Sequence, residues 1–130
     1  MSGQVIGHGI DLVENARIAR SVEMFGERFL DRVFTTAEIE YCRRQADPVP
    51  HLAVRWAAKE AVGKAFGTGL GEQIGWLDIE VTRDAGGRPG IMFHGDGACL
   101  AETAGVRVAQ VSLSHTKDYA MASVLLVGRG

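Results

Sequence analysis

The chain has 130 residues, a length that suits one domain with one hydrophobic core. Hydrophobic residues make up 46% and charged residues 23% of it, a balance that argues against intrinsic disorder. The formal net charge of −2 supplies no overall basic field, so an attraction to a charged partner must come from a local patch. We therefore expect a single domain over residues 1–130 that binds no nucleic acid.

The sequence also indicates a compartment. No apolar run approaches the ~18 residues of a membrane-spanning helix, and the first residues lack the pattern of a signal peptide. Cys42 and Cys99 stand far apart without metal-ligand spacing, and we interpret both as reduced, packed thiols. We expect a cytoplasmic protein that does not engage a membrane.

Residues 5–12 predict the first strand, in which Gly7 and Gly9 indicate a bulge or a close approach of another backbone. Asp11 lies at the end of this strand, where functional groups are often placed. A carboxylate that caps the next helix is an equally good interpretation.

A helix is predicted over residues 16–25, with Asn15 as its N-cap and Gly26 as its end. Its predicted apolar stripe consists of Ile18, Val22 and Phe25. Arg17 and Arg20 are three residues apart and share a face, which is either a solvated surface or a small basic patch for an acidic partner.

Two shorter helical segments follow. Residues 27–33 predict the first of them, and Thr35 with Glu38 forms a capping box that starts the second, which we expect to run to about Gln45. The prolines of the 47–50 segment then predict a loop, because a proline disfavours helix in the residue before it.

The longest helix is expected to start just after Pro50 and to end at Gly67, since glycine readily adopts the left-handed conformation at a helix terminus. Its small residues, Ala57, Ala58, Ala61 and Ala65, fall on one arc that can pack closely. Glu60 and Lys64 neighbour each other on a different face. They are either an exposed ion pair or part of a site for a metal and a phosphate.

The second half of the chain predicts strands with one short helix between them. Leu77, Ile79 and Val81 alternate with polar residues, and the 84–87 turn returns the chain into a strand over residues 91–94, with Pro89 near its start. A helix over 97–104 and strands over 106–113 and 119–127 complete the chain. The result is an α+β domain with a mostly antiparallel sheet, which the N-terminal strand joins.

The side chains that fit a common chemistry are hard oxygen donors, lysines and hydroxyls. Asp11 and Glu60 suit Mg²⁺, which takes carboxylates together with substrate phosphates. Lysines and hydroxyls suit phosphate oxygens; here they are Lys59, Lys64 and a predicted hydroxyl-rich turn with Ser112, Ser114 and Thr116. This set favours a Mg²⁺-dependent phosphate-ester or pyrophosphate enzyme, without indicating which phosphate.

These residues resemble the motifs of the holo-[acyl-carrier-protein] synthases, the small 4'-phosphopantetheinyl transferases. The matching segments follow the family's order over nearly the whole chain: Gly9-Ile10-Asp11; Phe34-Thr35-Thr36-Ala37-Glu38; Trp56-Ala57-Ala58-Lys59-Glu60-Ala61-Val62-Gly63-Lys64; Gly87-Arg88-Pro89; and Ser112-Leu113-Ser114-His115-Thr116. Any one of them alone is a weak signal, and together they are highly specific.

The resemblance implies transfer of the 4'-phosphopantetheine group of coenzyme A to a serine of apo-acyl carrier protein, with release of adenosine 3',5'-bisphosphate. It implies that Asp11 and Glu60 bind Mg²⁺ and that Lys64 contacts a phosphate near the reacting centre. Either Glu60 or a metal-bound water that it holds would take the serine proton. The residues implied in coenzyme A binding are Arg55, Lys64, Pro89, Ser112, Ser114, His115 and Thr116.

The resemblance also implies a homotrimer of phosphopantetheinyl transferase-like fold, with active sites between subunits. Because acyl carrier proteins are acidic, Arg17 and Arg20 become the expected carrier-protein contacts. The carrier protein would belong to fatty-acid or polyketide synthesis, and the sequence does not separate the two.

Two residues depart from the family's pattern. His8 stands where an apolar residue is usual, either as a packed strand histidine or as a disturbance beside Asp11, and Gln110 stands where a histidine is frequent. Two rival functions are a coenzyme A or nucleotide sensor without turnover and a Mg²⁺-dependent phosphohydrolase.

Overall fold

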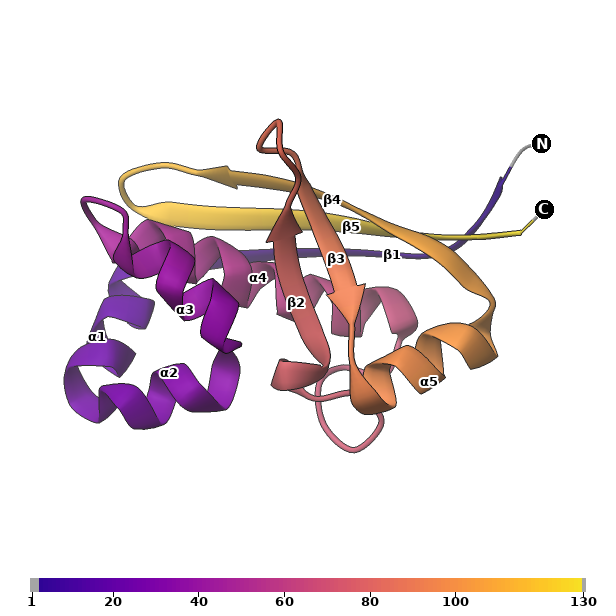
Figure 1. The fold of residues 1–130 in the computed structure, drawn as a ribbon, viewed down its shortest axis with the longest axis horizontal. Coiled ribbons are helices and arrows are strands. Elements are labelled where there is room, and N and C mark those ends of the chain that lie inside the picture. The colour runs from indigo at the N-terminus through magenta and orange to yellow at the C-terminus, as the bar shows by residue number, and fades with distance from the viewer. Residues whose placement is uncertain (1–2, 130) are drawn as a thin grey trace.

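Helix α4 (Pro48–Phe66) lies along one face of a three-stranded sheet, and the other elements are arranged around this pair (Figure 1). The computed structural model describes residues 3–129. The sheet has the order β1 (Gly3–Glu14), β5 (Tyr119–Arg129), β4 (Val106–His115), and its pairings are antiparallel. The predicted α+β class is confirmed, including the N-terminal strand in the sheet and the long central helix.

The two faces of this sheet differ in what covers them. Along β5, Ala120, Ala122, Val124 and Leu126 are fully buried and alternate with more exposed residues. Alternate side chains of a strand point to opposite faces, so the buried series marks the face that packs on α4. The other face is open along its length in Figure 1. We call it the open sheet face.

Helices α1 (Asn15–Phe25), α2 (Glu27–Val33) and α3 (Thr36–Arg43) lie at one end of the sheet. The predicted capping box of α3 is present: the Thr35 hydroxyl accepts from the Glu38 amide, and Glu38 accepts from the Thr35 amide at 2.8 Å. The prediction that Asn15 caps α1 is wrong. Its buried side-chain amide instead donates to the carbonyls of Thr116 and Lys117, which ties α1 to the β4–β5 turn.

Helix α4 begins at Pro48, three residues before the predicted start just after Pro50. Proline is compatible with a first helical turn, because the amides there have no partner inside the helix. The Asp47 side chain accepts from the Val49 amide and completes this start. The helix ends at Gly67 in the left-handed conformation, with φ of 80°, as predicted. The predicted close-packing arc is also confirmed, since Ala57, Ala58 and Ala61 are fully buried and Ala65 nearly so.

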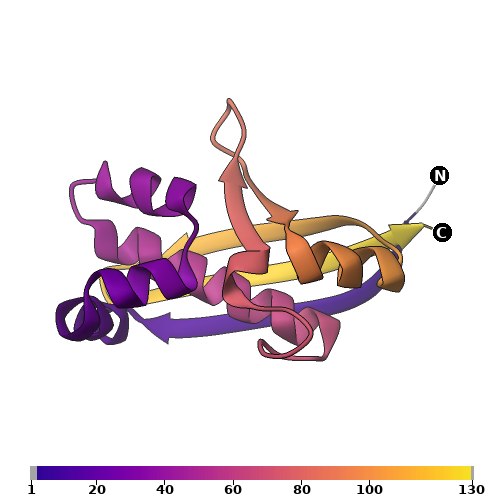
Figure 2. The same ribbon diagram turned by 60° about the horizontal axis from the view of Figure 1, so that its bottom comes forward.

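The strands β2 (Ile79–Arg83) and β3 (Pro89–Phe93) form a separate antiparallel hairpin that projects beside the main sheet (Figures 1 and 2). A short 3-10 helix, η1 (Trp76–Asp78), precedes it, and α5 (Gly95–Ala104) follows it. Leu77 lies in η1 and is exposed, so its predicted place in the strand is wrong. Pro89 opens β3, as expected for a residue that cannot donate a backbone hydrogen bond.

Strand β4 extends through Ser112, Ser114 and His115, which the sequence placed partly in a turn. Register explains the difference: Ser112 pairs with Ser123 and Ser114 with Met121, so ladder hydrogen bonds continue past the apolar part of the strand. The connection to β5 therefore contains only residues 116–118.

Lys59 and Glu38 form a fully buried ion pair, at 2.7 Å between Nζ and Oε1. The ammonium also donates to the carbonyls of Val33 and Trp76, and the second carboxylate oxygen accepts from the Val81 amide. The expectation that Lys59 serves phosphate oxygens is therefore wrong. The hydrogen bonds of this ion pair connect α2, α3, α4, η1 and β2. Burial lowers the pKa of Lys59, and Glu38 acts in the opposite direction.

Three smaller expectations are also corrected. Cys99 is exposed rather than packed, whereas Cys42 is buried and burial raises its pKa to about 11. Phe25 is 52% exposed and so does not belong to the core stripe of α1. His8 lies exposed on the open sheet face, hydrogen-bonded to Ser123, and neither packs in the core nor disturbs Asp11. Within residues 3–129, no helix has the length and apolar character to cross a membrane.

Candidate functional site

Asp11, Glu60 and Lys64 meet where β1 crosses the last turns of α4. The Lys64 ammonium donates to Asp11 Oδ1 at 2.9 Å and to the Ile10 carbonyl at 3.0 Å. Lys64 therefore pairs with Asp11 of the neighbouring strand instead of with Glu60. The approach depends on Gly9, because a Cβ there would collide with the Ala61 carbonyl oxygen.

The electrostatics of this group are those of two crowded carboxylates. Partial burial and the neighbouring Asp11 charge raise the pKa of Glu60, while Lys64 and Arg17 act in the opposite direction. Arg17 reaches this region by lying over the Trp56 ring, with 4.9 Å between its guanidinium carbon and the ring centroid. A cation bound by both carboxylates would stabilise the ionised form of Glu60.

The donor set fits a magnesium ion. Asp11 Oδ2 is buried and has no hydrogen-bond partner, so one carboxylate oxygen is free to bind a cation. No cluster of three or more His, Cys, Asp or Glu side chains suited to a metal occurs among residues 3–129. Magnesium is commonly held by one or two carboxylates and completes its shell with water and substrate phosphates, which matches a two-carboxylate site.

A second, strongly cationic group surrounds Tyr41 of α3. The guanidinium carbons of Arg55, Arg83 and Arg44 lie 4.4, 5.4 and 5.9 Å from its ring centroid. These four residues help to line a cavity of about 280 Å³ between α3, α4 and β2. Arg55 is 1% exposed and its Nε has no partner, which leaves a buried donor available to an anion.

His115 lies beside this cationic group. Its ring makes an edge contact with that of His51 at 5.3 Å between centroids, and His51 in turn contacts Tyr41. Of the residues expected to bind coenzyme A, Arg55 and His115 are thus brought into one region. Sequence reasoning missed Arg44 and Arg83, and the only signal in the sequence was the three-residue spacing between Tyr41 and Arg44 at the end of α3.

The other expected coenzyme A residues are not gathered with this group. Ser112 and Ser114 pair with Ser123 and Met121, which alternate with the buried residues of β5. Their side chains therefore lie on the open sheet face, away from α4. The Thr116 hydroxyl accepts from the Tyr119 amide at 3.0 Å and stabilises the β4–β5 turn. Pro89 lies at the end of the β2–β3 hairpin, paired with Arg83.

Helix α4 keeps the two charged groups apart. Lys64 follows Arg55 by nine residues, which is 2.5 helical turns, or a rotation of about 180° and a rise of about 13 Å. Arg55 accordingly contacts α3, while Lys64 contacts β1 on the opposite side. One copy of the chain therefore presents two separate charged groups, one on each side of α4.

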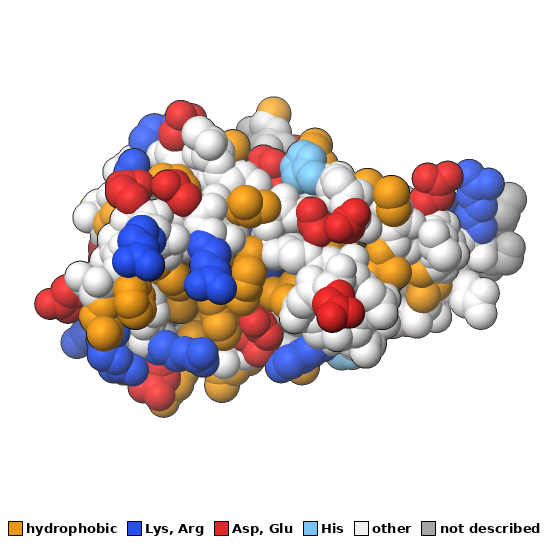
Figure 3. All heavy atoms as spheres, turned by 90° about the horizontal axis from the view of Figure 1, so that it is seen from below, with side chains coloured by type: hydrophobic (Ala, Val, Ile, Leu, Met, Phe, Trp, Pro, Cys, Tyr) orange, Lys and Arg blue, Asp and Glu red, His pale blue; other side chains and the backbone are white. Residues whose placement is uncertain are grey.

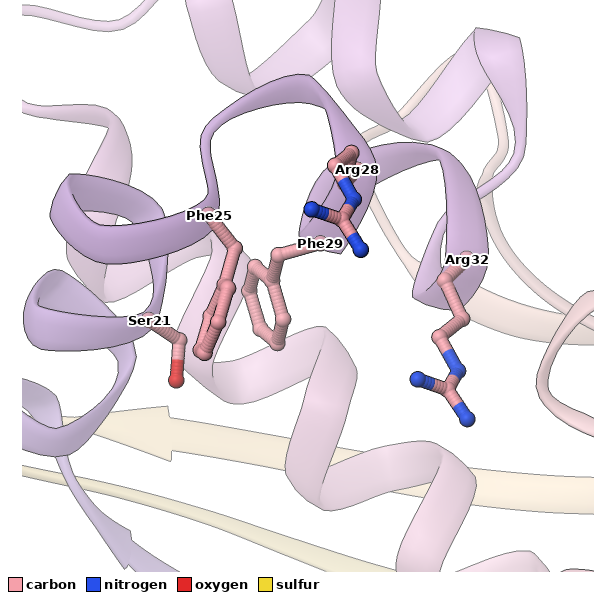
Figure 4. A pocket seen from close by; sticks show the side chains of 5 residues that line it. All are labelled: Ser21, Phe25, Arg28, Phe29 and Arg32. Atoms are coloured by element: carbon pink, nitrogen blue, oxygen red, sulfur yellow. The ribbon is translucent and has the colours of Figure 1, made fainter.

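Helices α1 and α2 carry a third surface, where basic side chains surround apolar ones at the left of Figure 3. A hollow of about 370 Å³ is lined there by Ser21, Phe25, Arg28, Phe29 and Arg32. In Figure 4 the rings of Phe25 and Phe29 lie next to each other, and the guanidinium groups of Arg28 and Arg32 extend from α2 beside them. We call it the α1–α2 hollow. Sequence reasoning missed this hollow because Phe25 and Phe29 belong to different helices, separated at Gly26, so that no single helical face relates them.

Comparisons with known proteins agree with this geometry. The family model described as the 4'-phosphopantetheinyl transferase superfamily matches residues 7–124. The chain belongs to this superfamily. The holo-[acyl-carrier-protein] synthase of Koribacter versatilis is 52% identical over 94% of this chain and 98% of its own, and that of Moorella thermoacetica is 48% identical over 91% of both. This transferase is therefore an enzyme of the holo-[acyl-carrier-protein] synthase type.

Solved structures show the same fold. The crystal structure of the Neisseria meningitidis holo-[acyl-carrier-protein] synthase matches this transferase with a TM-score of 0.88 at 32% identity, covering 95% of this chain and 98% of that one. The Helicobacter pylori enzyme, solved in complex with coenzyme A, matches with a TM-score of 0.82 at 29% identity, covering 92% and 98%. The phosphopantetheinyl transferase-like fold predicted from the motifs is thus confirmed.

Proposed function

We propose that this single-domain protein transfers 4'-phosphopantetheine from coenzyme A to a serine of apo-acyl carrier protein, in a Mg²⁺-dependent reaction that releases adenosine 3',5'-bisphosphate. One observation carries the proposal: a buried, unpartnered oxygen of Asp11 lies in a group with the Glu60 carboxylate and the Lys64 ammonium. This combination suits a pyrophosphate that needs both a metal and a cation.

The reaction exchanges one phosphorus–oxygen bond for another. The serine oxygen of the carrier protein bonds to the phosphorus that carries pantetheine, and the bond from that phosphorus to the bridging oxygen of the pyrophosphate breaks. The serine proton passes to Glu60 or to a metal-bound water that it holds. Lys64 leaves Asp11 for the phosphate and balances the charge that develops there.

Asp11 and Glu60 would hold the magnesium ion, whose bound charge neutralises the pyrophosphate and helps to orient it. In this role Asp11, Glu60 and Lys64 are the catalytic residues. Gly9 contributes by allowing β1 to approach α4 closely enough for the three side chains to meet.

Coenzyme A carries its phosphates in two places, the pyrophosphate and the ribose. With the pyrophosphate at Asp11, Glu60 and Lys64, the cationic group around Tyr41 suits the ribose phosphate. Arg55 and His115 would bind it there. The remaining residues proposed for coenzyme A binding are Pro89, Ser112, Ser114 and Thr116.

The separation of the two charged groups favours a homotrimer with active sites between subunits. Since Arg55 and Lys64 project from opposite sides of α4, two copies are needed to bring both kinds of group to one coenzyme A molecule. The open sheet face supplies a contact surface with an unusual number of exposed apolar side chains. They are Val5, Ile10, Leu12, Val108, Tyr119 and Met121.

For the acidic carrier protein, we propose a docking surface that starts at Arg17 and Arg20 and continues into the α1–α2 hollow. Arg17 lies over the Trp56 ring and acts to lower the pKa of Glu60, which places this arginine next to the reacting groups. The hollow combines Phe25 with Arg28 and Arg32, which suits an acidic surface with an apolar side chain.

Both cysteines are free thiols, as expected in the cytoplasm.

The intact mass of apo-acyl carrier protein, after incubation with this protein, coenzyme A and Mg²⁺, tests the proposal. We expect a gain of one phosphopantetheine that EDTA abolishes and added Mg²⁺ restores. Binding of coenzyme A without any gain, over several carrier proteins, would instead favour a sensor. Loss of coenzyme A in the absence of a carrier protein would favour a phosphohydrolase.

The metal assignment has its own test in Glu60→Gln, with Glu40→Gln on the exposed side of α3 as the matched control. We expect Glu60→Gln to reduce transfer at least 100-fold and the control to leave it unchanged. An active Glu60→Gln enzyme with the same Mg²⁺ dependence would show that the metal is bound elsewhere.

A further inference from the structure

Two imidazoles are in contact beside the cationic group around Tyr41. His51 lies in the first turns of α4 and His115 at the end of β4, with their ring planes 62° apart and their centroids 5.3 Å apart. The opposite neighbour of His51 is the Tyr41 ring, at 6.2 Å. The His51 ring thus stands between the aromatic residue that three arginines surround and the histidine expected to bind the ligand.

The charged groups that face His51 are nearly all positive. They are Arg55 on its own helix and Arg83 from β2, against one carboxylate, that of Asp47 at the start of α4, and the His115 imidazole from β4 also acts to lower the pKa of His51. From α3, Tyr41 brings the Arg44 guanidinium into the same region. Partial burial lowers the pKa of His51, as do His115, Arg55 and Arg83, with Asp47 acting in the opposite direction. In the ligand-free protein His51 is therefore neutral at pH 7.

We propose that His51 is a further coenzyme A-binding residue, which takes up a proton when the ribose phosphate binds beside Arg55 and His115. This inference rests on the proposed function. A phosphate dianion reverses the sign of the local field, because it places two negative charges among the guanidinium groups that face His51. The imidazole then gains more from being charged than it loses through burial, and its second N–H becomes a donor.

A residue of this kind favours a ligand that carries the ribose phosphate over one that lacks it. Without ligand, His51 adds no charge to the repulsion among Arg44, Arg55 and Arg83. With ligand, it adds one cation. By linkage, a group that takes up a proton on binding makes the affinity rise as the pH falls. We therefore expect coenzyme A to bind more tightly at pH 6.5 than at pH 8.5.

Isothermal titration calorimetry of the full-length protein with coenzyme A measures this uptake. At pH 7.5 in two buffers of different ionisation enthalpy, the wild type should show net proton uptake on binding coenzyme A. The ligand phosphate is already almost fully ionised at this pH, since its second pKa is about 6. It therefore releases few protons that would mask the uptake. Dephospho-coenzyme A, which lacks the ribose phosphate, should bind with little or no uptake.

The matched variants are His51→Gln and His94→Gln. His94 pairs with Glu80 at 2.8 Å, and Glu80 also lines the cavity around Tyr41. His94→Gln therefore measures the effect of losing a histidine at the edge of this cavity, and it should reduce the uptake clearly less than His51→Gln does. His51→Gln should lose at least half of the uptake and weaken coenzyme A binding about 3- to 10-fold at pH 6.5, with a smaller effect at pH 8.5. His51→Phe, which keeps the aromatic contacts, serves as a second variant if His51→Gln does not fold.

The inference is overturned if either His51 variant takes up as many protons as the wild type. It is also overturned if the wild type takes up as many protons with dephospho-coenzyme A as with coenzyme A. Absence of coenzyme A binding to the wild type would overturn the proposed function itself. A nuclear magnetic resonance titration of the wild type checks the assignment independently. The apparent pKa of the His51 ring should rise on addition of coenzyme A, and a value that stays unchanged contradicts the proposal.

Discussion

Gly9 carries no side chain, and this determines how closely Asp11 approaches helix α4. A Cβ at Gly9 would meet both the carbonyl oxygen of Ala61 and, at 2.8 Å, the amide nitrogen of Ala65. Both are backbone atoms of a helix and cannot rotate away. The Gly-x-Asp segment is therefore a steric requirement of the site as well as a sequence signature.

Replacing Gly9 with alanine should lower the free energy of unfolding by about 2–3 kcal/mol, because β1 must lift from α4. It should also reduce Mg²⁺ affinity, because Asp11 moves with the strand. Urea denaturation measures the first effect. Gly71→Ala is the control: a Cβ there meets nothing within 4 Å, and its unfolding should change by less than about 0.5 kcal/mol. Equal stability of the two variants would contradict the close approach.

Glu60 illustrates a conflict between stability and function. Its pKa is raised by burial and by Asp11, so between the unfolded and folded pKa values the native state binds more protons than the unfolded state does. The ionised carboxylate therefore costs stability at neutral pH. Glu60→Gln should stabilise the metal-free protein by about half a kcal/mol at pH 7, after allowance for solvent screening.

This gain should disappear as the pH falls below the unfolded pKa, where Glu60 is protonated in both states. Thermal unfolding of the wild type and Glu60→Gln at pH 4 and pH 7, both with EDTA, checks the expectation. A variant that is less stable than the wild type at pH 7 would mean that Glu60 makes a favourable interaction in the metal-free protein.

At the scale of the elements, the buried pair of Lys59 and Glu38 holds the helical end of the molecule to α4. Removal of one partner leaves the other charge buried and unpaired, so Lys59→Met and Glu38→Gln should each cost about 3–5 kcal/mol. The double variant should cost clearly less than the sum of the two. Chemical denaturation of all four proteins in a double-mutant cycle gives the coupling, and strictly additive losses would show that the two side chains act independently.

The elements that the sequence predicted best are those that local chemistry determines. The Thr35–Glu38 capping box and the left-handed Gly67 each satisfy backbone groups within a few residues, and both were found as predicted. Lys59 and Asn15 were misread because their partners are distant in sequence. Lys59 reaches Val33 and Trp76, and Asn15 reaches the turn at Thr116.

The candidate site was predicted in the same uneven way. The motifs identified Asp11, Glu60 and Lys64, and the fold brings these three together. No local pattern relates Arg83 of β2 to Tyr41 of α3, because their contact depends on how the β2–β3 hairpin docks. Periodicity indicated that Ser112 lies in or near a strand end, but only the register of β4 with β5 places it on the open sheet face.

At the scale of the whole molecule, the open sheet face and the divided polar site lead to the same expectation. The proposed assembly would cover the apolar sheet face and would bring Arg55 of one copy and Lys64 of another to the same ligand, although they lie on opposite sides of α4 within one copy. The proposed homotrimer therefore predicts that loss of the assembly abolishes activity while leaving the subunit folded.

Leu12→Lys tests this, since Leu12 is 58% exposed on the open sheet face, where it lies in the edge strand β1 and pairs with Met121 of the central strand β5. A buried lysine at an apolar interface is strongly unfavourable, whereas on a free surface it is harmless. Sedimentation velocity should show a trimer for the wild type and a monomer for Leu12→Lys, with unchanged circular dichroism. Transfer activity should fall with the trimer. Leu77→Lys makes the same substitution at an exposed leucine of η1, away from the open sheet face, and this variant should remain trimeric and active. A fully active Leu12→Lys monomer would mean that one subunit binds coenzyme A alone, and the two polar groups would then belong to different ligands.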